Sequence, residues 1–439
     1  MLSIKKILNT ISNFRCEIDG KEIIFPGTLQ EKEENIILIT MFPIEGYRKI
    51  GLYDEFVVTG KISGTEITLM GCHIQSASYT IENNDISLFI VPNEIIVGKC
   101  FYSMPMAKRI IVSTSDLNYM FAGLSPLESN YNFTKENPSV LNYTFPKLIN
   151  AKDKYGEIEL YQTFDAKCSI DVYEYSIISV IEYSFTKSMP LMDAVAKIAA
   201  ARSLFSFFGN GYVAFGSITF EDDMEETKYI LHLNCKEKVP AVNEPFLITT
   251  SMFGNQFQKV WESWLNLYES ASPIPTLFYE IVCNRSTRIN YYLNLSQAIE
   301  VYSNTYRKTE ARAIAKSDQK NTTKGKNTKL KHVYQDILVA YNSTLELTES
   351  NIENYAQGFS NMRNYYTHYN SRKYVEPSYD ELFSAIHILR FILLTIVYTA
   401  VGITVDNIIE CKKRAIFNKL DIDASKILNY SKKEFKESV

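Results

Sequence analysis

Three polar residues in the last third of the chain have types and a spacing that could act on a phosphate ester. In the stretch NMRNYYTHY, Arg363 and His368 are five residues apart and Asn364 directly follows the arginine. Histidine titrates near neutral pH and can move protons, whereas arginine stays charged and offers two parallel donors to phosphate oxygens. RNA carries its own nucleophile, the 2′-hydroxyl. These residue types could therefore cleave a phosphodiester such as that of RNA without a metal ion or other cofactor.

The element that must position these residues is a helix. An apolar stripe steps by three and four residues, as an amphipathic helix requires, through Ile352, Tyr355, Phe359, Met362 and Tyr366. On a straight helix five residues turn through about 500°, so Arg363 and His368 would point roughly 140° apart. Either the helix ends or bulges near residues 367–370, or two chains pool their pairs across an interface.

The R-N-x-x-x-H pattern among amphipathic helices resembles the signature of HEPN-domain ribonucleases. The surrounding chain, over about residues 253–406, looks like the Apea-like HEPN subgroup known from bacterial anti-phage defence. The resemblance implies an endoribonuclease of abortive infection that cuts host RNA, with tRNA a common target. It also implies a composite site at a dimer interface and 2′,3′-cyclic phosphate ends. In this pattern Asn364 would bond the phosphate or orient the histidine.

Glu300 resembles an acidic position in the corresponding helix of Apea-like domains. It would pair with Arg363 or bind near the site, and the structural alternative is an ordinary solvated glutamate. Asn364 has the alternative of a helix-surface amide. For the motif itself, the alternative is an exposed arginine and a histidine stacked among tyrosines. His73, His232, His332 and His387 have no partner at ligand spacing and are expected to be structural.

A basic stretch precedes the motif helix. Residues 307–331 contain nine Lys or Arg against two acidic residues, and nine minus two gives +7, although the whole chain carries −4. Such a local cluster is either a solvated loop or the footprint expected for a phosphate backbone. Beside a ribonuclease motif we expect RNA contact, and Arg372 and Lys373 would extend it. The expected RNA-binding residues are Lys316, Lys320, Lys324, Lys326, Lys329, Lys331, Arg372 and Lys373.

The composition indicates a soluble protein of a reducing compartment. Seven widely spaced cysteines without a C-x-x-C pattern predict buried free thiols instead of disulfides or a zinc site. No N-terminal apolar run is long enough for a signal peptide. The apolar run at residues 391–405 is shorter than the roughly 20 residues that a membrane span needs. We therefore predict a buried helix there and a cytoplasmic location.

The first half of the chain is strand-like. Short β-branched and aromatic runs are broken by turn pairs such as Asp19-Gly20, Ser63-Gly64 and Asn84-Asp85, which predicts an all-β sandwich or barrel. The expected strand regions are residues 22–25, 36–39, 56–58, 67–69, 86–90, 109–112, 158–161, 173–185, 213–220 and 229–233. A helix opens at Pro190 and stops near Gly209. This half resembles, in general character only, the β domain that precedes Apea-like HEPN domains.

From about Phe253 the periodicity changes to 3.6, and five helices are expected. They cover residues 257–268 (ended by Pro273 and Pro275), 292–306, 333–341, 352–366 and 382–405, the last after a Ser378–Glu381 capping box. The predicted fold class is α+β and multidomain, with a β-rich N-terminal domain over 1–245 and a helical HEPN bundle over 253–439.

Two other functions stay open. The helical bundle could be a non-catalytic HEPN-type scaffold that dimerises and binds RNA or a partner protein. The β-rich domain could bind a carbohydrate or peptide. In the nuclease hypothesis that domain restrains a toxic site or senses infection, with a phage-derived trigger.

Overall fold

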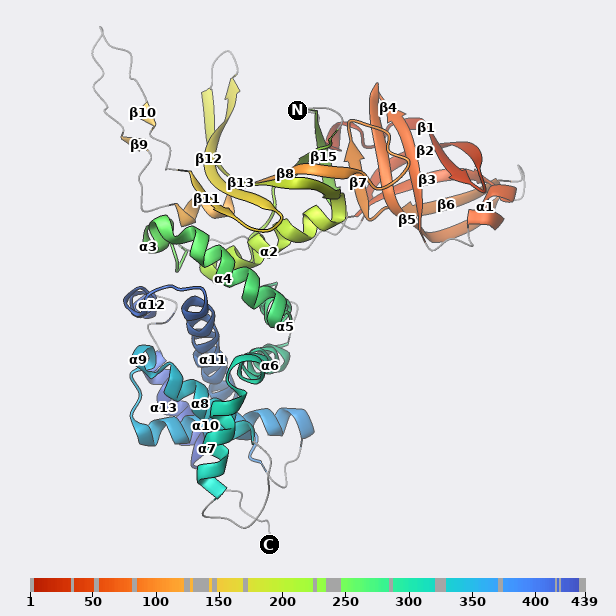
Figure 1. The fold of residues 1–439 in the computed structure, drawn as a ribbon. Helices are drawn as coiled ribbons and strands as arrows, with labels where there is room; N and C mark the ends of the chain where they lie inside the picture. The colour runs from red at the N-terminus through yellow and green to blue at the C-terminus, as the bar shows by residue number, and fades with distance from the viewer. Residues whose placement is uncertain are drawn as a thin grey trace. The chain divides into compact units, whose positions relative to one another are not determined.

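The structure is a computed structural model, which describes residues 4–32, 35–50, 55–80, 85–121, 127–128, 142–143, 148–168, 173–223, 227–233, 246–283, 287–319, 329–369, 374–414, 417 and 420–433. The chain divides into two compact units. The β unit comprises residues 1–115, 147–199 and 215–238, and the helical unit comprises residues 116–146, 200–214 and 239–439. Figure 1 shows the elements of both.

The β unit is built on one antiparallel sheet, which has 13 strands among the described residues. Most of the predicted strand regions lie inside these strands, although the strand predicted from residue 213 begins only at Ser217. The sheet strands are β1 (Ile11–Ile18), β2 (Lys21–Lys32), β3 (Asn35–Pro43), β4 (Phe56–Ile62), β5 (Thr65–Thr80), β6 (Asp85–Val91), β7 (Glu94–Val97), β8 (Met106–Thr114), β11 (Ile149–Lys152), β12 (Gly156–Cys168), β13 (Tyr173–Pro190), β14 (Ser217–Glu221) and β15 (Lys228–Leu233).

Six of these strands close into a barrel. Strand β5 pairs with β4 and, through its second half, with β6, and the pairings β4–β1–β2–β3–β6 complete the ring. Alternate residues point inward and form the core, which includes Phe14, Phe25 and Phe42. Of the two predicted β architectures, the barrel is therefore the one that these strands form (Figure 1).

Two predicted turns are confirmed at hairpin tips of the barrel. Asp19 and Gly20 join β1 to β2 with φ of 52° and 72°, and Ser63 and Gly64 join β4 to β5 with φ of 49° and 85°. Positive φ at both central residues matches the right-handed twist of the flanking strands in a two-residue turn. The third predicted pair includes Asn84, which lies outside the described residues.

The rest of the sheet runs from the barrel as β5–β7–β15–β14–β8–β13–β12–β11. Strand β13 leads into α2 (Leu191–Gly209), the helix predicted to open at Pro190. Residues of α2 up to 199 belong to the β unit, and those from 200 on belong to the helical unit. A short helix that the sequence did not indicate, α1 (Ile44–Ile50), follows β3.

The helical unit is a bundle in which the motif helix is central. Helix α10 packs against α8 and α13, and α11 packs against α6 and α13. The helices are α3 (Thr250–Phe253), α4 (Phe257–Ser270), α5 (Pro273–Val282), α6 (Arg288–Tyr306), α7 (Lys308–Gln319), α8 (Leu330–Ala340), α9 (Asn342–Leu345), α10 (Glu349–His368), α11 (Tyr379–Ala400), α12 (Val405–Lys412) and α13 (Leu420–Ser431). The predicted α+β class with a C-terminal helical bundle is confirmed.

Helix α11 is the apolar helix that the sequence placed in the interior. Among the described residues it is the one helix long and apolar enough to cross a membrane: it has 22 residues, and its most apolar 18-residue stretch has a mean hydropathy of 1.9. Most of that stretch is nevertheless buried. Its predicted capping box is present: Ser378 Oγ accepts from the Glu381 N–H, and a Glu381 carboxylate oxygen accepts from the Ser378 N–H at 2.8 Å. The helix ends at Ala400, short of the predicted Val405.

Five described cysteines are free, in line with the predicted thiols. Cys16, Cys72, Cys283 and Cys411 are buried, and Cys100 is half-buried. Burial raises the pKa of Cys16 and of Cys411 to about 12, so both stay protonated near neutral pH. A protonated, buried thiol is a poor nucleophile, and we assign these cysteines to the core.

Candidate active site

Helix α10 carries all three residues of the motif, and its predicted apolar stripe is buried. Ile352, Tyr355, Phe359, Met362 and Tyr366 are each at most 7% exposed. Within this stripe Phe359 packs on Tyr334 of α8, and Tyr366 packs on Tyr292 of α6. Arg363 lies beside it, so the guanidinium emerges at the rim of a packed helix face and not on a free surface.

Arg363 is held by Glu300 of α6. Its Nε donates to Glu300 Oε1 at 3.2 Å, and the two side chains are 29% and 22% exposed. Of the two roles that the sequence left open for Glu300, the structure has the pairing. Within the described chain the two terminal amino groups of Arg363 form no other hydrogen bond. The ion pair therefore fixes one edge of the guanidinium and leaves the phosphate-binding end available.

The ion pair is anchored in the core by two residues that the sequence did not indicate. Ser296, which is 1% exposed, donates from Oγ to Glu300 Oε1 at 3.3 Å. Its single proton is then committed, so the hydroxyl of Tyr334 on α8 donates to Ser296 Oγ. Burial raises the pKa of Tyr334 well above its usual range, which keeps this donor protonated. A connected chain of polar groups thus crosses α10, α6 and α8.

His368 is the last residue of α10 and is exposed. The helix does end in the predicted window, but only after the histidine, because Tyr369 takes a left-handed conformation with φ of 45°. Arg363 and His368 therefore lie on one regular helix, about 140° apart around its axis. A break between them does not bring them together, and the pooling of two chains stays as the prediction.

Asn364 and the basic residues have mixed outcomes. Asn364 is half-buried, and its role stays a prediction. Lys316 on α7 and Lys329 before α8 are exposed, whereas Lys331 is ion-paired to Glu353 at 2.7 Å. The remaining predicted RNA-binding residues lie outside the described residues: Lys320, Lys324, Lys326, Arg372 and Lys373.

The basic stretch is not one continuous loop. Residues 308–319 form α7, which packs on α8 and α6. Arg307, counted in the charge cluster, is used for structure: its Nε and Nη2 donate to the two carboxylate oxygens of Asp336 at 2.7 and 2.8 Å. Asp336 is 3% exposed, so this pair clamps the end of α6 to α8. Its charge does not contribute freely to RNA binding.

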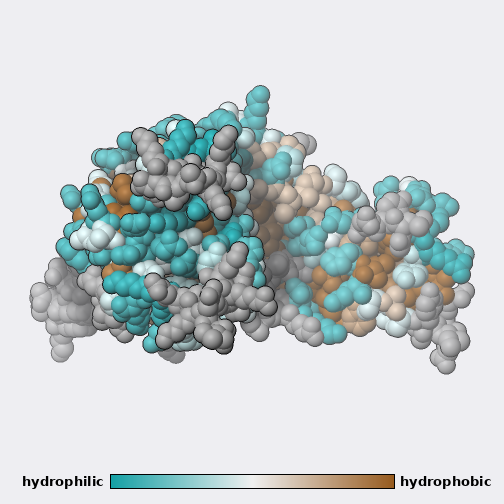
Figure 2. All heavy atoms as spheres, turned by 90° about the horizontal axis from the view of Figure 1, so that it is seen from below, coloured by the Kyte–Doolittle hydropathy of each residue, from teal (hydrophilic) through white to brown (hydrophobic). Residues whose placement is uncertain are grey.

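Figure 2 shows the helical unit from the end where α7 and α10 lie, and the described surface there is mostly hydrophilic. Among the described residues, no three His, Cys, Asp or Glu side chains gather as a metal site would require. The buried His332 is structural, as expected, because its Nδ1 accepts from the Lys329 N–H at the start of α8.

Two family models match the chain. The model of ApeA N-terminal domain 1 matches residues 14–264, and the model described as Apea-like HEPN matches residues 293–407. No curated protein and no solved structure gives a significant match. The N-terminal match covers more than half of the chain, and the second covers the motif helix together with the Glu300 helix. The chain therefore belongs to the Apea-like HEPN proteins, with an ApeA N-terminal domain followed by a HEPN domain.

Proposed function

We propose that the chain is an endoribonuclease that cuts host RNA, tRNA among the candidates, in the bacterial cytoplasm during abortive anti-phage defence. The combination of the two matched domains fits a family of defence nucleases, and HEPN domains are generally ribonucleases that dimerise and bind RNA. The observation that carries the proposal is the Arg363 guanidinium, held on one edge by Glu300 with its other nitrogens available.

The proposed reaction uses the RNA's own 2′-hydroxyl. An imidazole removes its proton, the 2′-oxygen bonds to phosphorus, and the bond from phosphorus to the 5′-oxygen breaks while a second imidazole protonates the leaving oxygen. The Arg363 guanidinium stabilises the charge that develops on the phosphorane. The products are a 2′,3′-cyclic phosphate and a 5′-hydroxyl. No metal ion takes part in these steps.

A dimer provides what one chain lacks in this scheme. One imidazole cannot be base and acid at the same moment, and Arg363 points away from His368 on the same helix. If two copies of α10 meet across a two-fold axis, His368 of one protomer acts as base and the partner's His368 as acid. Glu300 then serves as a positioning residue for the guanidinium, and Asn364 bonds the phosphate or orients an imidazole.

The N-terminal domain would keep this site silent until infection, because an unrestrained ribonuclease would arrest its own host. A phage-derived trigger would release it. The exposed Lys316 and Lys329, with the other predicted basic residues, would hold the RNA backbone.

The test is to map the ends of cellular RNA after expression of the wild-type chain and of His368→Ala. We expect new 5′-hydroxyl and cyclic-phosphate ends and growth arrest with the wild type, and neither with the variant. The matched control is Thr367→Ala, which changes the neighbouring exposed residue and should cut as the wild type does. Size-exclusion chromatography and an RNA-binding assay verify that His368→Ala still dimerises and binds.

One observation favours the alternative, a non-catalytic HEPN scaffold that dimerises and binds RNA. Glu300 neutralises much of the charge that Arg363 would offer to a phosphate, as a purely structural pair would. In that case wild type and His368→Ala give the same RNA ends. If both cut equally, catalysis belongs to other residues and the assignment of His368 is wrong.

A further inference from the structure

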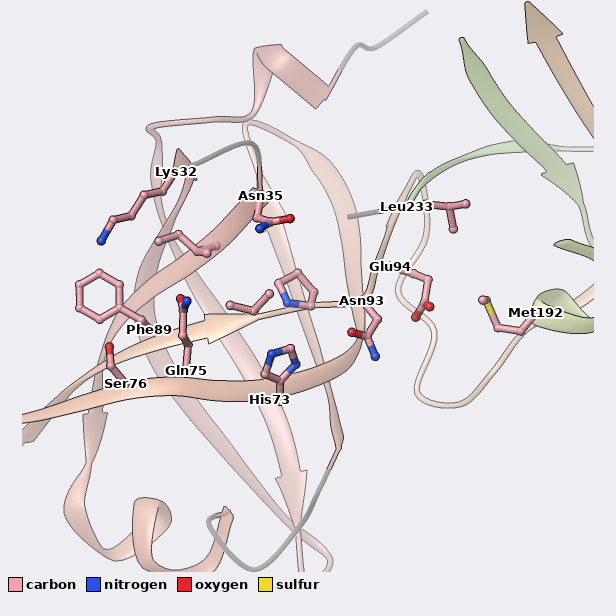
Figure 3. Close-up of a pocket in the computed structure, with 13 residues that line it drawn as sticks. Lys32, Asn35, His73, Gln75, Ser76, Phe89, Asn93, Glu94, Met192 and Leu233 are labelled. Carbon is pink, nitrogen blue, oxygen red and sulfur yellow. The ribbon is translucent and has the colours of Figure 1, made fainter. Parts of the chain in front are cut away.

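A groove of about 890 Å³ lies on the outer face of the barrel. Side chains from β2, β3, β5, β6 and β7 line it, and Met192 of α2 and Leu233 of β15 lie at one end, all within the β unit (Figure 3). Its volume is within the range of about 300–1,000 Å³ that ligand pockets occupy. The barrel's own core is filled by other side chains, so the groove is a separate feature of the surface.

Strand β5 has an irregularity in its backbone where it lines this groove. The pairing with β6 shifts between Ile74 and Ser76, which leaves Gln75 as the extra residue of a β-bulge. A bulge removes its residue from the ladder and re-aims the side chain, and bulges are frequent beside binding sites. His73 was expected to be structural, but its side chain and that of Gln75 are exposed and form no hydrogen bond within the described part of the chain. Both can therefore bond a ligand.

Asn93 lines the groove, and its side chain is held in place by contacts with Glu55 and Gly71. Its Nδ2 donates to Glu55 at 3.3 Å. It packs over Gly71, whose φ is +56° and where an added Cβ would lie 2.6 Å from that same nitrogen. The left-handed φ favours glycine at this position, and an added Cβ would push the Asn93 side chain aside. The wall thus depends on a close backbone approach that a larger residue would displace.

Opposite charges occupy the two ends of the groove, as Figure 3 shows. At one end Lys32 Nζ lies over the Phe89 ring, 5.1 Å from its centroid. At the other end is Glu94, which is partly buried and has no cation within ion-pair distance among the described residues. Burial, and secondarily the Glu55 carboxylate, raise the pKa of Glu94. A positively charged ligand group beside Glu94 would relieve this cost.

The groove's chemistry fits a peptide better than a sugar. Sugar recognition would use the open face of an aromatic ring, but the ammonium of Lys32 already covers Phe89. Amide and imidazole groups between two charged ends suit the N–H and C=O groups of an extended chain. We propose that this groove binds an extended peptide segment of a partner protein, with an acidic group at Lys32 and a basic group at Glu94. The proposal does not require that the chain be a nuclease.

The experiment measures peptide binding to the full-length protein without RNA. The probes are pools of heptapeptides with random central positions and fixed ends: Arg with Asp, Ser with Ser, Arg with Arg, and Asp with Asp. Equilibrium dialysis followed by mass spectrometry gives the bound fraction at low salt. We expect the Arg–Asp pool to bind best, by about two- to fivefold for each matched end, because partly exposed ion pairs contribute little.

Reversing one charge of the groove should produce a new peptide preference, which a misfolded variant would not show. Lys32→Glu makes both ends acidic and should switch the preference to the Arg–Arg pool, whereas Glu94→Lys should switch it to the Asp–Asp pool. The control reversals Lys61→Glu on β4 and Glu45→Lys on α1 change exposed residues outside the groove and should leave the preference unchanged. Equal binding of all pools, or preferences that ignore the reversals, overturns the proposal. So does selective binding of a chito-oligosaccharide over every peptide pool.

Discussion

Arg363 does not rely on its own side-chain stiffness for position. Its Nε edge is fixed by Glu300, Glu300 by Ser296, and Ser296 by Tyr334, so the guanidinium is oriented by a polar chain that ends inside the bundle. The Tyr334 ring also packs on Phe359 of α10, 5.5 Å between centroids. Tyr334 therefore contacts both α10, which carries Arg363, and the hydrogen-bond network that orients the Arg363 guanidinium.

Removing Ser296 should show how much this network contributes. In Ser296→Ala the Tyr334 hydroxyl loses its hydrogen bond to Ser296 while it stays buried, which costs about 1–3 kcal/mol of the free energy of unfolding. Glu300 also loses its support, so we expect RNA cleavage to fall while RNA binding is kept. Urea denaturation and single-turnover cleavage measure the two effects.

The double variant Ser296→Ala with Tyr334→Phe is the matched control. Replacing both partners removes the unsatisfied hydroxyl, so most of the lost stability should return, while cleavage stays low because Glu300 is still unsupported. If the double variant is as unstable as the single one, the hydroxyl pair does not explain the loss. If its cleavage recovers, the network has no positioning role.

At this scale the sequence could predict residue types but not partners. Glu300 was singled out because a single helix position resembled an acidic position of the family, and its pairing with Arg363 was one of two options. Ser296 gave a weak signal, one polar residue four before Glu300 in an apolar stripe. Tyr334 gave none, because its meeting with Ser296 depends on how α6 and α8 pack and not on spacing within either helix.

At the scale of elements, the end of α10 decides what one chain can do. The helix stays regular through His368, which fixes the angle to Arg363, and it stops at Tyr369. The basic stretch before it has two parts with different tasks. Arg307 and Lys331 are ion-paired to Asp336 and Glu353, whereas Lys316 and Lys329 are exposed.

This difference predicts unequal effects on RNA binding. Changing Lys320, Lys324, Lys326 and Lys329 together to Gln should weaken binding and flatten its salt dependence. On single-stranded RNA the log–log slope should fall by about 0.7 for each phosphate that the variant no longer neutralises. Lys331→Gln should change the slope less, because Glu353 already compensates its charge. Fluorescence anisotropy across a salt series measures the affinity and the slope for both variants. An unchanged slope in the fourfold variant would mean that these lysines are solvated and do not contact RNA.

Helices α5 and α7 were not predicted from the sequence, and each omission has a physical reason. Pro273 and Pro275 do end α4, but a proline in the first turn also suits a new helix, and α5 begins at Pro273 itself. Helix α7 is rich in charge and poor in apolar residues, so periodicity gave little sign of it. The apolar residues that it buries are only small ones, Ala311 and Ala315. The strong stripes of α4 and α10 were readable because they bury large side chains.

At the scale of the whole chain, the sequence division at 1–245 and 253–439 differs from the compact units. Residues 200–214 belong to the helical unit. Within it Phe207 stacks on Phe278 with centroids 3.8 Å apart, and Trp264 Nε1 donates to the carbonyl of Ala200. Periodicity cannot reveal this, because the residues are far apart in sequence and meet only in the folded unit.

Two fragments test where the helical unit begins. We expect residues 253–439 to be unstable or aggregated, since the loss of one large buried aromatic such as Phe207 costs about 3–5 kcal/mol and Trp264 loses its cover. Residues 200–439 should unfold cooperatively at a higher temperature. Circular dichroism and size-exclusion chromatography compare the two. Equal stability would support the division predicted from the sequence.

The proposed nuclease needs an assembly in which one site uses the imidazoles of both protomers. Wild-type and His368→Ala chains are unfolded together in equal amounts and refolded, so that about a quarter of the two-fold dimers keep both imidazoles. Cleavage should then fall to about a quarter of that of the same total amount of wild-type chain. If wild-type and His368→Ala dimers are mixed without subunit exchange, about half of the wild-type cleavage activity should remain. If wild-type chains exchange subunits with Thr367→Ala chains, all of the activity should remain. If half remains although mixed dimers are isolated by differential tags, each chain acts alone, and the end of α10 must rearrange to bring Arg363 and His368 together.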